Sequence, residues 1–234
     1  MRLPQLYPGR LLKRHRRFLA DVELPDGSVI TALVPNTGSL LSCADPGMPV
    51  WLREEPGEQR KYRFVWTLVR PKRSLVCIDT AVPNRLVYEY AAAQKIPQLA
   101  GFREYVREMP CGAHTRFDLC CRVHEADMLD RIWVEVKSTT MLRDGVAGFP
   151  DSVTARGLKH LVELQRVVAA GERALQVFLV QRADAKVFRP AEDIDPAYSA
   201  QLRKAAKAGV GVVALQARVN QERIAIIGEI PVEL

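Results

Sequence analysis

An aspartate, a glutamate and a lysine are the residues of this chain whose types and spacing best suit chemistry. Asp118 lies in the run T-R-F-D-L-C-C-R-V-H, and after sixteen intervening residues Glu135 and Lys137 lie in the run R-I-W-V-E-V-K. A buried charge needs a partner or a metal. Brought together, the three side chains could hold a divalent cation and stabilise a developing negative charge.

The two runs are β-prone and flank a short acidic break, E-A-D-M-L-D, which predicts a β-hairpin over residues 115–137. Side chains alternate along a strand. This alternation predicts that Phe117 shares a face with Leu119 and Cys121, and that Asp118 lies on the opposite face. The alternative to a metal site is an edge-strand salt bridge in which Arg116 joins the two carboxylates and the lysine.

Composition indicates an ordinary globular chain of 234 residues, 48% hydrophobic and 26% charged. No stretch of 18 or more apolar residues predicts a membrane-spanning helix, and the first residues show no secretory signal, so we expect a cytoplasmic location without membrane partners. The five cysteines are odd in number and form no C-x-x-C pair, which favours buried free thiols.

The net charge of +7 is uneven along the chain. Residues 1–75 hold 13 Lys/Arg against 7 Asp/Glu, whereas residues 76–234 hold 21 against 20. A basic N-terminal third indicates a module that meets a polyanion, most often nucleic acid, although a solvated basic surface is the alternative.

The first 80 residues predict an all-β barrel. Short β-prone runs are separated by turn sequences such as Pro25-Asp26-Gly27 and Asp45-Pro46-Gly47. Five such strands fit an OB-fold. The predicted strands are residues 10–12, 18–24, 29–34, 49–52 and 64–69.

Basic residues cluster at two places in this barrel and could line a phosphate-tracking groove. Bases could stack on Tyr62, Phe64 and Trp66 beside the second cluster. For Phe64 and Trp66 we favour the alternative, a place in the barrel core. The clusters comprise Lys13, Arg14, His15, Arg16 and Arg17, and then Arg60, Lys61, Arg63, Lys72 and Arg73.

After Pro83 the hydrophobic period changes, so we divide the chain into domains at residues 1–80 and 81–234. Asn84 is suited to cap a helix over residues 84–94, with Glu89 in its middle. Residues 141–151 predict a loop. Ser152 or Thr154 could cap the next helix, which we expect to run to about residue 170. The remaining prediction is strands at residues 102–109, 174–181, 211–218 and 223–230, and a helix at residues 196–208.

This α-β-β-β-α-β-α-β order predicts a mixed sheet with helices on its faces. With D-x(n)-E-x-K on its second and third strands, the pattern resembles the PD-(D/E)XK nuclease core. The resemblance implies Mg²⁺ (or Mn²⁺) ligands at Asp118, Glu135 and the carbonyl of Val136, with Lys137 as the catalytic cation. It also implies a further metal contact from Glu89.

The helix beginning near Thr154 adds Arg156, Lys159 and His160. These residues lie three or four apart and could meet a phosphate near the start of a helix. A solvated helix face is the alternative.

Five segments occur in an order similar to that of the sugar fermentation stimulation protein A (SfsA) family of bacteria and archaea. They are R-F-L-A-D-V (17–22), P-N-T-G-S (35–39), P-N-R-L-V (83–87), F-P-D-S-V-T-A-R-G-L-K-H-L (149–161) and A-E-D-I-D-P-A-Y (191–198). The sequence departs from the family pattern at Val34 and at Thr115, and neither residue is a proposed metal ligand. The resemblance implies an OB-fold followed by a PD-(D/E)XK-like α/β domain, DNA binding without sequence preference, and a regulatory part in maltose metabolism.

Two functions follow as expectations: a Mg²⁺-dependent nuclease, or a non-catalytic DNA-binding regulator that retains a nuclease fold. The oligomeric state stays open, with a homodimer as one option. The expected DNA-binding residues are Lys13, Arg14, Arg16, Arg17, Asn36, Arg60, Lys61, Arg116, Arg156, Lys159 and His160.

Overall fold

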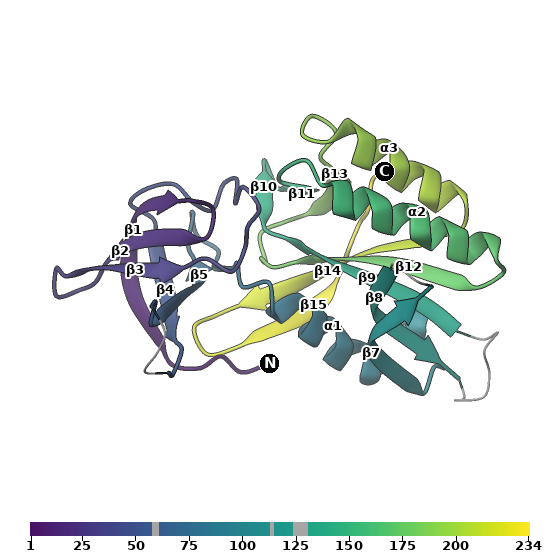
Figure 1. Cartoon of the computed structure of the whole chain (residues 1–234), viewed down its shortest axis with the longest axis horizontal. Coiled ribbons are helices and arrows are strands. Elements are labelled where there is room, and N and C mark those ends of the chain that lie inside the picture. Colours follow the sequence, from purple (N-terminus) through teal and green to yellow (C-terminus); the bar gives the residue numbers. More distant parts are fainter. Residues whose placement is uncertain (58–60, 113–114, 124–130) are drawn as a thin grey trace.

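The computed structural model describes residues 1–57, 61–112, 115–123 and 131–234. A β-barrel is followed by an α/β body, and the two lie side by side along the long axis (Figure 1). No helix in these ranges is long and apolar enough to cross a membrane. The predicted residues Arg60 and E-A-D-M-L-D (125–130) lie outside the described ranges.

The barrel is one sheet of order β3-β2-β1-β4-β5-β6 that closes where Leu33 of β3 pairs with Val65 of β5. Leu11 and Trp66 are fully buried in its core and Phe64 packs against it, so the core positions preferred for these two aromatics are confirmed. The first strand is longer than predicted. The strands are β1 (Leu6–His15), β2 (Leu19–Glu23), β3 (Val29–Leu33), β4 (Pro49–Glu54), β5 (Phe64–Val69) and β6 (Val76–Cys77).

The α/β body contains a mixed sheet of order β15-β14-β12-β9-β8-β7. Its central strand β12 (Arg173–Val180) runs parallel to both neighbours, while the outer pairs are antiparallel. Leu175 and Val177 of β12 pack on one face and Phe178 and Val180 on the other, which confirms a strand buried on both sides. The other strands are β7 (Glu104–Cys111), β8 (Thr115–Arg122), β9 (Arg131–Thr139), β14 (Gly211–Val219) and β15 (Ile224–Ile230).

Helices cover both faces of this sheet, α1 on one side and α2 with α3 on the other (Figure 1). Thr154 caps α2 by accepting a hydrogen bond from the amide of Gly157, as predicted. Gly171 and Gly209 follow α2 and α3 at φ of 88° and 102°, conformations that favour glycine and end a helix. The helices are α1 (Val82–Ala92), α2 (Ala155–Ala169) and α3 (Pro196–Lys207), with a 3₁₀ turn η1 at Pro97–Leu99.

Two local predictions were wrong. Helix α1 begins at Val82 with no side-chain cap, so Asn84 lies inside the first turn rather than at the cap. The expected loop at residues 141–151 contains the strands β10 (Met141–Arg143) and β11 (Val146–Phe149), which join β13 (Val187–Pro190) in a small second sheet. Asp144 and Gly145, both at positive φ, form the tight turn that permits this pairing.

The first residues of the chain are bound to the far edge of the α/β sheet. The amide of Leu3 donates to the carbonyl of Glu222, and the amide of Ile224 donates to the carbonyl of Met1. The barrel is therefore attached to the α/β body before β1 as well as after β6.

Candidate functional site

The candidate site lies where strands β8 and β9 stop pairing. Their ladder extends from Arg122–Arg131 to Leu119–Val134. Beyond it, Oδ2 of Asp118 accepts a hydrogen bond from the amide of Val136 at 2.7 Å. A side chain thus takes an amide that a longer antiparallel ladder would use.

The predicted alternation fails at this point. Phe117 does not share the core of Leu119 and Cys121, but packs on the α2 side against Trp133, with ring centroids 5.6 Å apart. The alternation assumed a continuous ladder, and the ladder is interrupted at Asp118. The neighbouring residue Glu108 on β7 has a φ of 53°, a strained conformation for a non-glycine residue.

Asp118 is held from two directions. Besides the amide of Val136, Nδ2 of Asn84 donates to its Oδ1 at 2.6 Å. Burial, followed by the negative charge of Glu135, raises the pKa of Asp118 to about 6, despite the opposing effect of the amide hydrogen bond. The protein therefore maintains a carboxylate in a place that disfavours its charge, a pattern found at functional sites.

Glu135 is almost fully buried, and its two oxygens differ. Oε1 accepts from Nζ of Lys137 at 2.6 Å and from Nδ1 of His160. Oε2 is buried without a hydrogen-bond partner among the described residues. Burial alone would raise the pKa of Glu135, but the hydrogen bond from His160 and the charge of Lys137 outweigh it and lower the pKa.

The structure therefore brings together Asp118, Glu135 and Lys137, but not Glu89. Glu89 is exposed and pairs with Arg85 at 2.9 Å. It lies five residues beyond Asn84, about 140° around the helix, so it faces away from Asp118. The structure does not place Glu89 with the carboxylate pair, and the metal contact expected from it stays a prediction.

His160 also differs from the prediction. It was expected to meet phosphate on a helix surface, but it is only 8% exposed and binds Glu135. The helix period did place it near Arg156 and Lys159, which are exposed at the start of α2. Sequence spacing alone does not tell which face of a helix packs on the sheet.

Two further polar residues at the site were missed. Gln176 is fully buried on β12, where Nε2 donates to the carbonyl of Glu135 at 3.0 Å and Oε1 has no partner among the described residues. Tyr198 of α3 is equally buried, with a hydroxyl that lacks a described partner. Burial, and then the charge of Glu135, raises the pKa of Tyr198. A glutamine inside an apolar strand was the available signal for Gln176.

The expected DNA-binding residues of the barrel have different roles. Arg14 stabilises the loop at residues 36–39. Its guanidinium donates hydrogen bonds to the carbonyls of Asn36, Gly38 and Ser39 at 2.7–2.9 Å and also to that of Arg17. The side chain of Asn36 accepts the amide of Gly38 at 2.9 Å and so stabilises the same loop. The residues with exposed charge are Lys13, Arg16, Arg17, Lys61 and, on β8, Arg116.

Two family models match the chain. The "SfsA N-terminal OB domain" matches residues 12–78, and the "Sugar fermentation stimulation protein RE domain" matches residues 81–223. The chain belongs to the SfsA family. The sugar fermentation stimulation protein homologues of Geobacter sp. (strain M21) and Rhodospirillum centenum are 44% and 47% identical to it, over 100% and 97% of each chain.

The fold of this SfsA family member also matches a solved structure. Pyrococcus furiosus SfsA in complex with Ca²⁺ is similar with a TM-score of 0.88 and 28% identity, over 100% of this chain and 98% of the other. An N-terminal OB barrel and an α/β domain with a mixed sheet, both predicted from the sequence, are confirmed.

Proposed function

We propose that this protein is a divalent-metal-dependent phosphodiesterase that cuts nucleic acid with little sequence preference. The observation that carries the proposal is the convergence of Asp118, Glu135 and Lys137 where β8 and β9 separate. Maintaining two coupled carboxylates and a cation in a buried position costs stability, and such arrangements recur where catalysis requires them.

The donor set fits a hard divalent cation. Asp118 and Glu135 would hold Mg²⁺ or Mn²⁺, together with the carbonyl of Val136, and the unpartnered Oε2 of Glu135 is a ligand atom in need of a partner. No three His, Cys, Asp or Glu side chains group as a metal site among the described residues, but Mg²⁺ usually keeps several waters and needs few protein ligands. When bound, the metal would polarise a phosphoryl oxygen and lower the pKa of a bound water.

The relative from Pyrococcus furiosus supports this assignment, because it was solved in complex with Ca²⁺. Ca²⁺ prefers oxygen ligands, as Mg²⁺ does. The proposal applies the same preference to the carboxylate pair of this chain.

The remaining groups have separable tasks. Lys137 would offset negative charge at the phosphate, since its ammonium group lies beside Glu135 at the edge of the opened ladder. His160 would hold the Glu135 carboxylate in place and keep it ionised. Asn84 would orient Asp118 from the opposite side.

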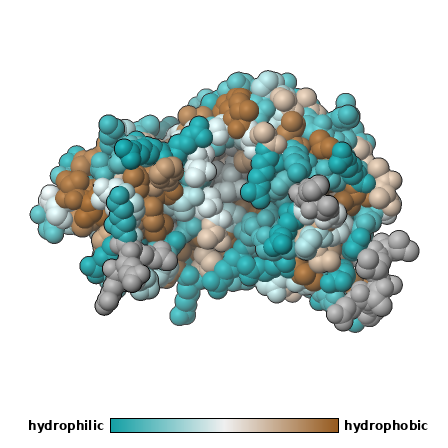
Figure 2. All heavy atoms as spheres, viewed as in Figure 1, coloured by the Kyte–Doolittle hydropathy of each residue, from teal (hydrophilic) through white to brown (hydrophobic). Residues whose placement is uncertain are grey.

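Nucleic acid would reach the site along the barrel and the start of α2. Exposed Lys13 and Arg16 extend from the β1–β2 hairpin, and Arg156 is exposed near the first turn of α2. In Figure 2 the visible face is hollowed between the barrel and the α/β body, where pale residues of intermediate hydropathy predominate. Contacts of this kind bind the backbone rather than the bases, which accounts for low sequence preference.

The decisive experiment compares the wild-type protein with Lys137→Ala on single- and double-stranded DNA in Mg²⁺ or Mn²⁺. Cleavage should be lost with Lys137→Ala and with EDTA, and kept with Lys207→Ala, which removes an exposed lysine of α3. Equal cleavage by wild type and Lys137→Ala, or no cleavage of any substrate, would contradict the proposal.

A second candidate function is non-catalytic DNA binding in regulation, with maltose metabolism as the process that the family resemblance implies. One observation favours it: Lys137 and His160 both contact Oε1 of Glu135, so this carboxylate has partners without any metal. Under this alternative the Lys137→Ala protein and the wild type would bind DNA with the same steep salt dependence, and neither would cut.

A further inference from the structure

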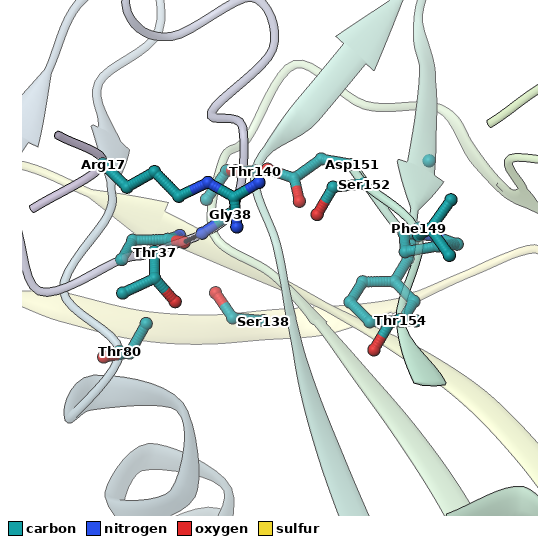
Figure 3. Close-up of a pocket in the computed structure, with 14 residues that line it drawn as sticks. Arg17, Thr37, Gly38, Thr80, Ser138, Thr140, Phe149, Asp151, Ser152 and Thr154 are labelled. Carbon is teal, nitrogen blue, oxygen red and sulfur yellow. Dashed lines mark hydrogen bonds between the residues drawn. The ribbon is translucent and has the colours of Figure 1, made fainter. Parts of the chain in front are cut away.

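A polar cavity of about 340 Å³ lies between the barrel and the α/β body. Its walls come from the β1–β2 turn, the loop at residues 36–38, the end of β9 and the loop from β11 to α2. Its lining is mainly hydroxyls, with one guanidinium and one carboxylate: Arg17, Ser138, Thr140, Asp151, Ser152 and Thr154 (Figure 3).

The positive group of the cavity is available to a ligand. Arg17 is exposed, and no hydrogen bond or ion pair of its guanidinium is found within the described residues. Figure 3 shows the guanidinium extending from the barrel toward Asp151 and Ser152. A planar guanidinium with free donors is suited to a phosphate group.

A second polar group of the cavity is without a hydrogen-bond partner among the described residues. Thr140 is 4% exposed, and its hydroxyl makes no hydrogen bond with a described residue, although the residue lines the cavity. Ser138 is positioned by Nε2 of Gln181, which donates to its Oγ at 2.8 Å and leaves the serine proton free to donate.

The walls are fixed by bonds between the two parts of the molecule. Oδ2 of Asp151 accepts from the amide of Leu40 at 2.8 Å, and the carbonyl of Asp151 accepts from the hydroxyl of Ser39. Gly38 lies so close that a Cβ there would be 2.6 Å from Oδ1 of Asp151. Oδ1 itself has no hydrogen-bond donor among the described residues, and so can accept one from a ligand.

This charge pattern selects a ligand with two different ends. A bare anion beside Arg17 also meets the negative charge of Asp151. A molecule with a phosphate at one end and hydroxyls at the other satisfies both groups and the serine and threonine hydroxyls between them. A volume of about 340 Å³ lies at the lower limit for small-molecule sites, and one nucleotide unit fits it.

We propose that this cavity binds one nucleoside monophosphate unit, with the phosphate on Arg17 and a sugar hydroxyl on Asp151. Ser138 directly follows Lys137 on β9, so the cavity and the carboxylate site are built on the same strand, with neighbouring side chains on opposite faces of it. The unit is either the phosphorylated end of a nucleic-acid strand or a free nucleotide; the first source, but not the binding itself, rests on the proposed function.

The test measures binding of dAMP, deoxyadenosine and inorganic phosphate to the full-length protein in EDTA by titration calorimetry. We expect dAMP to bind at least about tenfold more tightly than either fragment, because only dAMP satisfies both Arg17 and Asp151. Arg17→Gln should weaken dAMP binding by about tenfold or more, since it removes that charged donor. The control is Lys207→Gln, which changes an exposed lysine of α3 outside the cavity and should change the affinity by less than about twofold.

Thr140→Val keeps the shape of the side chain and should weaken dAMP binding by about fivefold, since it deletes one neutral hydrogen bond. Absence of saturable dAMP binding, or equal losses from Lys207→Gln and Arg17→Gln, would overturn the proposal. Competition of dAMP with 5′-phosphorylated and 5′-hydroxyl oligonucleotides then separates the sources. Displacement by the phosphorylated strand alone supports a strand end, and displacement by neither supports a free nucleotide.

The two proposals fail separately. dAMP binding is measured without divalent metal, so it does not depend on cleavage. If Lys137→Ala loses cleavage, its expected dAMP affinity is still that of the wild type. If the wild-type protein cuts DNA but does not bind dAMP, only the proposed phosphodiesterase function stands.

Discussion

The basic hairpin of the barrel and the carboxylate site of the α/β body use charge in opposite ways. At the hairpin Lys13 and Arg16 are exposed, and water and salt screen them. At the site Glu135 is 2% exposed and linked to Lys137 and His160. Exposed charges can therefore be removed with little effect on folding, whereas a change to the buried ones should alter both stability and the proposed activity.

The largest expected effect is that of Asp118→Asn. It should abolish cleavage and, in EDTA at pH 7–8, stabilise the protein by about 1–3 kcal/mol, because it removes a carboxylate whose ionised form the fold disfavours. The folded pKa is about 6 against an ordinary 3.8, so the folded state holds this proton more tightly and wild-type stability should fall as the pH rises from about 4 to 6.

Urea unfolding of wild type and Asp118→Asn across pH 4–8 measures this effect. Asn84→Ala serves as a control, because it removes the neighbour of Asp118 but keeps the carboxylate. Parallel pH profiles for wild type and Asp118→Asn would show that Asp118 titrates normally in the fold.

Arg14→Met should produce the next largest effect, a loss of about 1–3 kcal/mol in the free energy of unfolding. The substitution leaves carbonyls of the 36–39 loop without their donor, and unsatisfied polar groups carry this cost. Arg16→Met, an exposed residue of the same turn, should change stability by less than about 0.5 kcal/mol. Equal thermal midpoints for the two variants would show that Arg14 does not stabilise the 36–39 loop more than an exposed arginine does.

A smaller effect is expected from Lys13→Gln and Arg16→Gln on nucleic-acid affinity. Each should weaken binding to all sequences alike and reduce the slope of log affinity against log salt by about 1, because each removes one phosphate contact. Fluorescence anisotropy at several salt concentrations measures it. Sequence-dependent losses would place these residues on base edges instead.

The smallest effect on stability is expected from Tyr198→Phe. Its buried hydroxyl has no described partner, so removal should be neutral or stabilise by up to about 1 kcal/mol. If the hydroxyl acts on Glu135 during the reaction, kcat should fall while the thermal midpoint does not. A clear destabilisation would show that the hydroxyl has a partner.

Much of the fold was predictable because local signals agreed. Thr154 and Gly171 bracket α2, and the continuous apolar run at residues 174–181 is typical of a strand covered on both faces. Asp118, Glu135 and Lys137 were predictable because strand period and spacing place them on neighbouring strands.

The rest depends on tertiary packing, which no local pattern contains. The interruption of the β8–β9 ladder at Asp118 places Phe117 on the opposite face of the sheet from the predicted one. Only the packing of α2 on the sheet decides that His160 faces Glu135. Helix α1 begins two residues before the expected cap, which makes Asn84 a partner of Asp118. The cavity could not be predicted from the sequence, because Arg17 and Asp151 are far apart in the chain and line the same cavity only when the barrel packs against the α/β body.

The pairing of the first residues with the edge of the α/β sheet has a mechanical consequence. A barrel connected to the α/β body only after β6 could rotate about that connection as a hinge. The backbone hydrogen bonds of Leu3 and Met1 add a second attachment that opposes this rotation. Opening the molecule would require breaking these backbone hydrogen bonds as well as those to Asp151. We therefore expect the distance between the barrel and the α/β body to stay constant. The space between them would then admit ligands according to their thickness and would not close around them.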